Sequence, residues 1–155
     1  MIRKILLGSG LLLIALVLAS VTYASLTRDD TNARVAQEIQ SIPSGERAAR
    51  TMLLTLADGT MYPVNYLHEG DEVFMGIDGL WWREFEEESK PVTMFIKGET
   101  YTGQAIAVLD RPDYIKDIFS RLRPTVPKWL PDALNGKLVA IQLDEDSLVK
   151  IEAQQ

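Results

Sequence analysis

The sequence predicts an N-terminal transmembrane helix followed by a small β-rich (α+β) domain, an antiparallel barrel with two short helices. Three observations favour this fold class. Residues 5–26 are apolar and uncharged, residues 51–143 contain short apolar runs separated by Gly/Asp turns, and segments 80–89 and 111–122 have helical features. Short antiparallel strands with tight connections are best closed into a small barrel.

Composition narrows the chemistry of the domain. The chain has no Cys and one His, His68, which excludes disulfides, thiolate metal sites and any site with two imidazoles in one chain. The formal net charge is −6, and since Arg3, Lys4 and Arg28 are the only charged residues up to position 28, the remainder carries −9. We therefore expect no nucleic-acid binding, because phosphate neutralisation dominates that affinity.

The apolar stretch from Ile5 to Leu26 has no charged side chain. At about 1.5 Å per residue it extends about 33 Å as a helix, close to the thickness of a bilayer hydrocarbon core. Residues 1–27 are therefore predicted as a membrane anchor whose residues 5–26 contact lipid. A cleaved signal peptide, with Arg3 and Lys4 as its basic start, is the open alternative.

Basic residues on either side of the span indicate its orientation. Arg3 and Lys4 precede it with the α-amino group, and Arg28 and Arg34 follow it beside acidic residues. The positive-inside bias predicts a single-pass membrane protein with a cytoplasmic N-terminus and an extracytoplasmic domain.

After the anchor the chain divides into three parts. Residues 28–45 are predicted as a juxtamembrane helical spacer, because Val35 and Ile39 share one helical face before the chain breaks near Gly45. Residues 46–143 form the predicted barrel domain, and residues 144–155 an acidic C-terminal tail. The open alternative for part of the tail is that the last strand continues at Leu148 to Ile151.

Apolar runs and turn residues define the expected strands of the barrel. Asp58-Gly59 and Lys97-Gly98 are typical of tight turns, and Pro63 predicts an edge position or a bulge because proline cannot donate to a strand ladder. The expected strands are residues 52–56, 61–67, 72–77, 92–96, 100–109 and 137–143.

Two segments between the strands are expected to be helical. LWWREFEEES, residues 80–89, reads as a short helix or helical turn ended by Lys90-Pro91. The second helix starts near Pro112 with Asp110 as its cap. The predicted order is β-β-β-α-β-β-α-β.

Residues 70–110 resemble the split β-barrel superfamily of pyridoxamine-phosphate-oxidase-like proteins and deazaflavin-dependent nitroreductases. The resemblance implies a split barrel, binding of a flavin or deazaflavin, hydride transfer and a homodimer. The residues that carry it are Gly70-Asp71, the Gly76-x-Asp78-Gly79 turn, Trp81-Trp82-Arg83, Pro91-Val92 and the Gly98-to-Ala105 hairpin.

The resemblance also implies where a cofactor would lie. A ring would bind in a groove at the side of the barrel near Tyr62, Asn65, Trp81 and Trp82, with Arg83 near a phosphate. The alternatives are that one tryptophan packs in the core while the other lies at the rim of a pocket, and that Arg83 pairs with an adjacent glutamate. The sequence assigns no catalytic residue.

Deazaflavin-dependent members carry a basic phosphate-binding loop between their first two strands. The corresponding segment here, Asp58 to Pro63, contains no Arg, Lys or Ser. Two functions follow: a flavin- or deazaflavin-dependent oxidoreductase, or a non-catalytic accessory subunit of a larger membrane complex. A binder of small apolar ligands in the barrel mouth is a third.

Other titratable groups give no metal site. His68 falls in a predicted turn, where an exposed residue and an acid–base or ligand role are both open. The acidic runs 86–88 and 144–146 lack the ligand spacing of calcium loops. We therefore expect no bound metal.

Overall fold

The computed structural model describes residues 30–126 and 136–149. Its elements follow the predicted order, and the segment expected to be a short helix or helical turn is a 3-10 helix. The elements are β1 (Thr51–Thr55), β2 (Met61–Glu69), β3 (Glu72–Ile77), η1 (Leu80–Phe85), β4 (Lys90–Ile96), β5 (Glu99–Val108), α2 (Pro112–Leu122) and β6 (Lys137–Val149).

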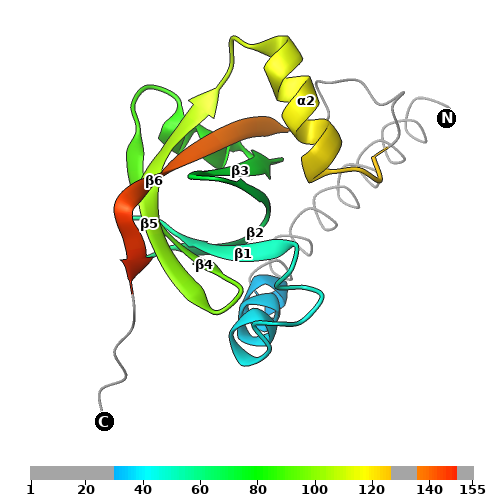
Figure 1. Ribbon diagram of the computed structural model, residues 1–155, viewed down its shortest axis with the longest axis vertical. Coiled ribbons are helices and arrows are strands. Elements are labelled where there is room, and N and C mark those ends of the chain that lie inside the picture. Colours follow the sequence, from blue (N-terminus) through cyan, green and yellow to red (C-terminus); the bar gives the residue numbers. More distant parts are fainter. Residues whose placement is uncertain (1–29, 127–135, 150–155) are drawn as a thin grey trace, which may run out of the picture. The chain divides into compact units, whose positions relative to one another are not determined.

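The six strands form one closed barrel in the order β1-β2-β3-β6-β5-β4, and all neighbouring strands are antiparallel. The last strand therefore lies between β3 and β5 (Figure 1). This confirms the predicted small antiparallel barrel. Closure satisfies the backbone groups that an open sheet would leave at its edges.

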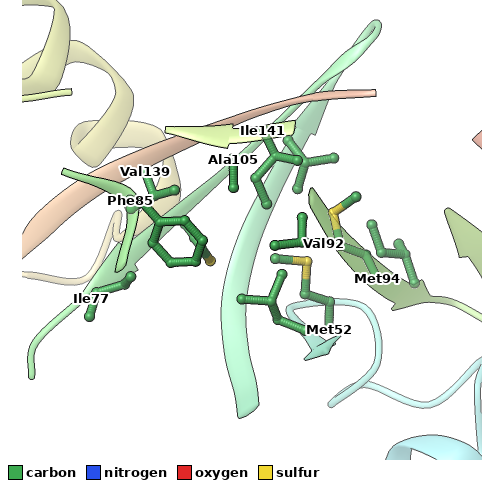
Figure 2. Close-up of a cluster of buried hydrophobic side chains, with 12 residues drawn as sticks. Met52, Ile77, Phe85, Val92, Met94, Ala105, Val139 and Ile141 are labelled. Atoms are coloured by element: carbon green, nitrogen blue, oxygen red, sulfur yellow. The ribbon is translucent and has the colours of Figure 1, made fainter. Parts of the chain in front are cut away.

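Alternate residues of each strand fill the barrel interior. On β3, Val73, Met75 and Ile77 belong to the interior cluster and Phe74 faces outward, as the period of two requires. Figure 2 shows Phe85 of η1 in this cluster with strand residues. The buried interior residues are Met52, Leu54, Val73, Met75, Ile77, Phe85, Val92, Met94, Ile96, Ala105, Val139 and Ile141.

Helix α2 covers part of the outer surface of the barrel (Figure 1). Its Ile118 and Phe119 form a second buried cluster with Phe74 of β3 and Leu138 of β6. Pro112 lies in the first turn, as predicted, but the N-cap residue is Arg111 and no side chain caps the helix. The expected Asp110 cap is therefore wrong.

Within the closed barrel, β2 and β3 pair over only part of their lengths. The β2–β3 ladder begins only at Tyr66 opposite Met75, so residues 61–65 pair with β1 alone. Pro63 lies in this half-paired stretch, which agrees with the edge position predicted for it. Helix η1 contributes to this region, since its Trp81 stacks on Tyr62.

Strand β6 extends beyond Leu143, the expected end of the last strand, and reaches Val149. The alternative of a strand continuation from Leu148 is therefore present as far as Val149. Tyr101 of β5 pairs with Leu148 and Gly103 pairs with Leu143, so residues 144–147 lie in a bulge opposite Thr102. The first half of the segment expected to be an acidic tail is thus a strand. The bulge leaves the acidic side chains of Asp144 and Glu145 exposed, so their charge does not oppose pairing.

Before the barrel, residues 30–41 are helical. From Ala36 onward the chain belongs to the same compact unit as the barrel, and Ile39 within it is only 1% exposed. Arg47 donates to Glu38 at 2.8 Å and ties this helix to the turn that follows. No helix within residues 30–126 and 136–149 is long and apolar enough to span a membrane. The predicted anchor, residues 1–27, lies outside the described residues.

Candidate functional site

Three aromatic side chains of β2 and η1 contact one another beside the stretch of β2 that pairs with β1 alone. The rings of Tyr62 and Trp81 lie parallel, with centroids 4.5 Å apart and planes at 11°. Phe85 meets Trp81 edge-on, with centroids 6.1 Å apart. Since Phe85 is fully buried in the barrel interior, it anchors this stack to the core. Together with Trp82, these residues are called the aromatic corner below.

Trp82 is the member of the aromatic corner that faces cationic groups. The guanidinium of Arg83 lies 5.9 Å from its ring centroid and the ammonium of Lys137 lies 5.7 Å from it. Within the described part of the chain, neither cation makes an ion pair with a carboxylate. The expected local pairing of Arg83 with a neighbouring glutamate is therefore absent there, and the nearby acidic run is instead paired through Glu88 and Lys90.

Sequence reasoning missed Lys137. It begins β6 and pairs with Ile77 at the end of β3, immediately before the turn into η1. Its approach to Trp82 depends on this long-range register, which no local pattern reveals. A planar indole flanked by two cations can bind a flat ligand that carries negative charge.

Asn65 does not join the aromatic corner. Tyr62, Val64 and Tyr66 share one face of β2, and the latter two pack against the barrel interior. Asn65 has the opposite parity and is exposed, and its Oδ1 accepts a hydrogen bond from Thr51 at 3.0 Å. The structure thus brings together four of the predicted ligand-binding residues and leaves the fifth on the outer surface.

The turn between β1 and β2 carries an acidic side chain, Asp58, in place of a basic phosphate loop. The Oδ1 atom of Asp58 accepts a hydrogen bond from the backbone N–H of Thr60 at 2.8 Å. This bond lowers the pKa of Asp58, so the carboxylate stays charged. A negative charge already bound to the turn amide does not fit a phosphate, and the phosphate contact of a cofactor would have to come from Arg83 and Lys137.

His68 lies in β2, opposite Val73, and not in the predicted turn. It is exposed, and its ring meets Tyr101 edge-on with centroids 5.7 Å apart. The hydroxyl of Tyr101 donates to Glu99 at 2.6 Å. Among the described residues, no group of three or more His, Asp or Glu side chains is placed to hold a metal ion.

We expect the hydroxyl of Tyr101 to ionise at a pH well above the pKa of an ordinary phenol. Its hydrogen bond to the Glu99 carboxylate, followed by burial, raises its pKa to about 12. Because the pKa is raised in the folded state, the stabilisation is complete below about pH 10, the unfolded value, and is lost as pH rises through about 12. The check is a 295 nm absorbance titration of wild type minus Tyr101→Phe. Glu99→Gln should lower the pKa of Tyr101 that this difference titration gives. A Tyr101 transition near pH 10 in wild type would contradict the prediction.

No protein-family model matches the sequence, and no curated protein matches it significantly. Several solved structures are similar to this chain. A proposed pyridoxamine 5′-phosphate oxidase from Listeria innocua has 15% identity over 70% of this chain and 90% of its own, with a TM-score of 0.45. A FAD-binding protein from Mesorhizobium loti has 16% identity over 71% and 90%, with a TM-score of 0.43.

An FMN-binding protein from Syntrophomonas wolfei has 14% identity over 86% of this chain and 99% of its own, with a TM-score of 0.38. At these low identities and TM-scores, the likeness adds nothing to the assignment of function. The closed barrel is established by the strand pairing itself.

Proposed function

We propose that the barrel domain binds a flat, anionic heterocycle of the flavin or deazaflavin class at the aromatic corner. The observation that carries this proposal is the pair of cations, Arg83 and Lys137, that face the indole of Trp82 without an acidic partner in the described part of the chain. The barrel interior is filled by side chains, so the ligand lies outside it.

The residues of the aromatic corner and the two cations beside it have distinct parts in binding. Trp82 offers a face for stacking, and Arg83 and Lys137 hold the negative charge of the ligand through charge-assisted hydrogen bonds of about 1.5–3 kcal/mol each. The stacked pair of Tyr62 and Trp81 supports η1 from the side of β2. A bound flavin would supply hydride chemistry, and this chain would bind, orient and shield it.

The sequence supports a membrane location for this domain. In the proposal, residues 5–26 hold the chain in the bilayer, and the basic residues Arg3 and Lys4 keep the N-terminus on the cytoplasmic side. The barrel would then face the extracytoplasmic side, where its ligand would have to be available.

A second function is favoured by the Asp58 turn. Its carboxylate occupies the backbone N–H of Thr60, and the adjoining segment of the chain offers no basic residue to replace it. A barrel with this turn suits a non-catalytic accessory subunit that docks to other proteins of a membrane complex. The two functions differ in whether the aromatic corner binds a ligand.

The test is a titration of the detergent-purified full chain with riboflavin, FMN, FAD and a deazaflavin, followed by fluorescence. We expect Trp82→Ala to weaken binding at least about fivefold, since stacking on an aromatic side chain contributes about 1–3 kcal/mol. Lys137→Ala should weaken FMN more than riboflavin, because riboflavin lacks the phosphate. Lys116→Ala is the control, since Lys116 is an exposed cation on α2 and not on β2, η1 or β6, the elements that carry the proposed site.

Two results would decide between the proposed functions. If wild type binds none of the four compounds and co-purifies with other membrane proteins, the ligand proposal fails and the accessory role stands. Binding that Trp82→Ala and Lys116→Ala leave equally unchanged would place the ligand elsewhere and also overturn the assignment to the aromatic corner.

A further inference from the structure

We infer that Arg123 is the positioning residue of the aromatic corner: by holding Asp78, it sets how Trp82 and Lys137 face each other. Arg123 follows the last turn of α2 and is not one of the ligand-facing cations. Its consequence for affinity rests on the proposed ligand site, whereas its effect on the geometry of the corner does not.

The contact between Arg123 and Asp78 has fork geometry. Nη1 donates to Oδ1 of Asp78 at 2.9 Å, and Nη2 donates to Oδ2 at 3.1 Å. Nη2 also donates to the carbonyl of Gly76 at 3.2 Å. The side chain of Arg123 is 18% exposed and its guanidinium lies 5.4 Å from the Phe119 ring centroid, so packing restricts it to this orientation.

Asp78 lies at the point from which η1 departs. It falls between Ile77, the last residue of β3, and Gly79, the N-cap of η1. No side chain caps η1 with a hydrogen bond. The first turn of η1, which carries Trp82, therefore lacks the usual local restraint at its start, and the Arg123 contact supplies one from another element.

The same carboxylate meets the chain just before Lys137. A Cβ atom on Gly136 would lie 2.6 Å from Oδ1 of Asp78 and 2.6 Å from the carbonyl oxygen of Ile77, and Gly136 has a φ of +75°. Only glycine lets the backbone approach this closely in this conformation. Lys137 then pairs with Ile77 in the β3–β6 ladder.

Both halves of the cation–indole contact thus start at Asp78. Trp82 follows it on η1, and Lys137 begins β6 against it. A shift of Asp78 would change the position of Trp82 relative to Lys137 without removing any group that touches a ligand. A lysine in place of Arg123 could not reproduce the two-pronged contact, because its ammonium is a single point charge.

The experiment uses the detergent-purified full chain carrying Trp129→Phe, so that Trp81 and Trp82 are its only tryptophans. Near-UV circular dichroism without ligand reports the corner, and FMN titration reports affinity. We expect Arg123→Gln and Arg123→Lys both to change the tryptophan bands and to weaken FMN at least about fivefold. Asp78→Asn combined with Arg123→Gln should do little more than either change alone, because the two residues act as one contact.

Two controls separate positioning from loss of stability. Arg121 lies in the last turn of α2 and makes ion pairs with Glu69 of β2 and Asp117 of α2. Arg121→Gln removes both pairs and should leave the tryptophan bands and the affinity for FMN unchanged. Ile118→Val trims the packing of α2 on the barrel and lowers the melting temperature without touching Asp78.

Equal changes of the tryptophan bands and affinity in Ile118→Val would overturn the inference, as would unchanged tryptophan bands in Arg123→Gln. If wild type binds no FMN, the proposed function fails, but the bands without ligand still decide the positioning role.

Discussion

Phe85→Ala should destabilise the domain by about 3–5 kcal/mol, the range for removing a large buried aromatic side chain. Phe85 is 0% exposed and is the residue through which η1 enters the barrel interior (Figure 2). Its loss leaves a cavity and also removes the edge-on contact with Trp81. Small domains have a free energy of unfolding of only about 5–15 kcal/mol, so this change alone would remove much of it.

Leu80→Ala is the matched control, since Leu80 begins the same 3-10 helix and is 72% exposed. It should change the free energy of unfolding by no more than about 0.5 kcal/mol. Thermal melts of the full chain in detergent, followed by near-UV circular dichroism, measure both. Similar losses in the two variants would show that η1 is not anchored through Phe85.

The strands between residues 51 and 109 could be predicted from the sequence because their signals are local. Gly59 and Gly98 both have positive φ in the turns that Asp58-Gly59 and Lys97-Gly98 predicted. The half-paired position of Pro63 also follows from its missing N–H. The short helix or helical turn expected over residues 80–89 is present as the 3-10 helix η1, and β4 begins at Lys90-Pro91, where the helical segment was expected to end.

The candidate site was predictable only in part. The stacking of Tyr62 on Trp81 requires the split between β2 and β3, and the approach of Lys137 to Trp82 requires the register of β6. These are long-range pairings that no window of sequence contains. The outward position of Asn65 is predictable from the sequence, because its odd separation from Tyr62 puts the two side chains on opposite faces of a strand.

The end of β6 shows how tertiary structure overrides composition. Residues 144–146 are all acidic, and such a run ordinarily indicates a solvated tail. In the barrel, β5 offers pairing partners beyond this run, at Tyr101 and Thr100, and a bulge accommodates the charged residues between two ladders. Pairing with β5 therefore extends a strand that local propensity would have ended.

Strands β5 and β6 approach closely at Gly103, beside that bulge. A Cβ atom on Gly103 would lie 2.5 Å from the carbonyl oxygen of Gln142 and 3.0 Å from Cγ2 of Ile141. Backbone cannot yield as a flexible side chain does, so Gly103→Ala must push β6 away from β5 where the register shifts. We expect a loss of about 1–3 kcal/mol in the free energy of unfolding, the usual cost of overpacking.

The matched control is Gln104→Ala, the next residue of β5, whose side chain is exposed. It should stay within about 0.5 kcal/mol of wild type in the same thermal melts. Hydrogen exchange adds a local readout, because strain at Gly103 should speed exchange of β6 amides beyond Leu143 more than those near Val139. The prediction is wrong if Gly103→Ala is as stable as Gln104→Ala and the β6 amides exchange equally slowly in both variants. In that case the close approach at Gly103 is not required for the extension of β6.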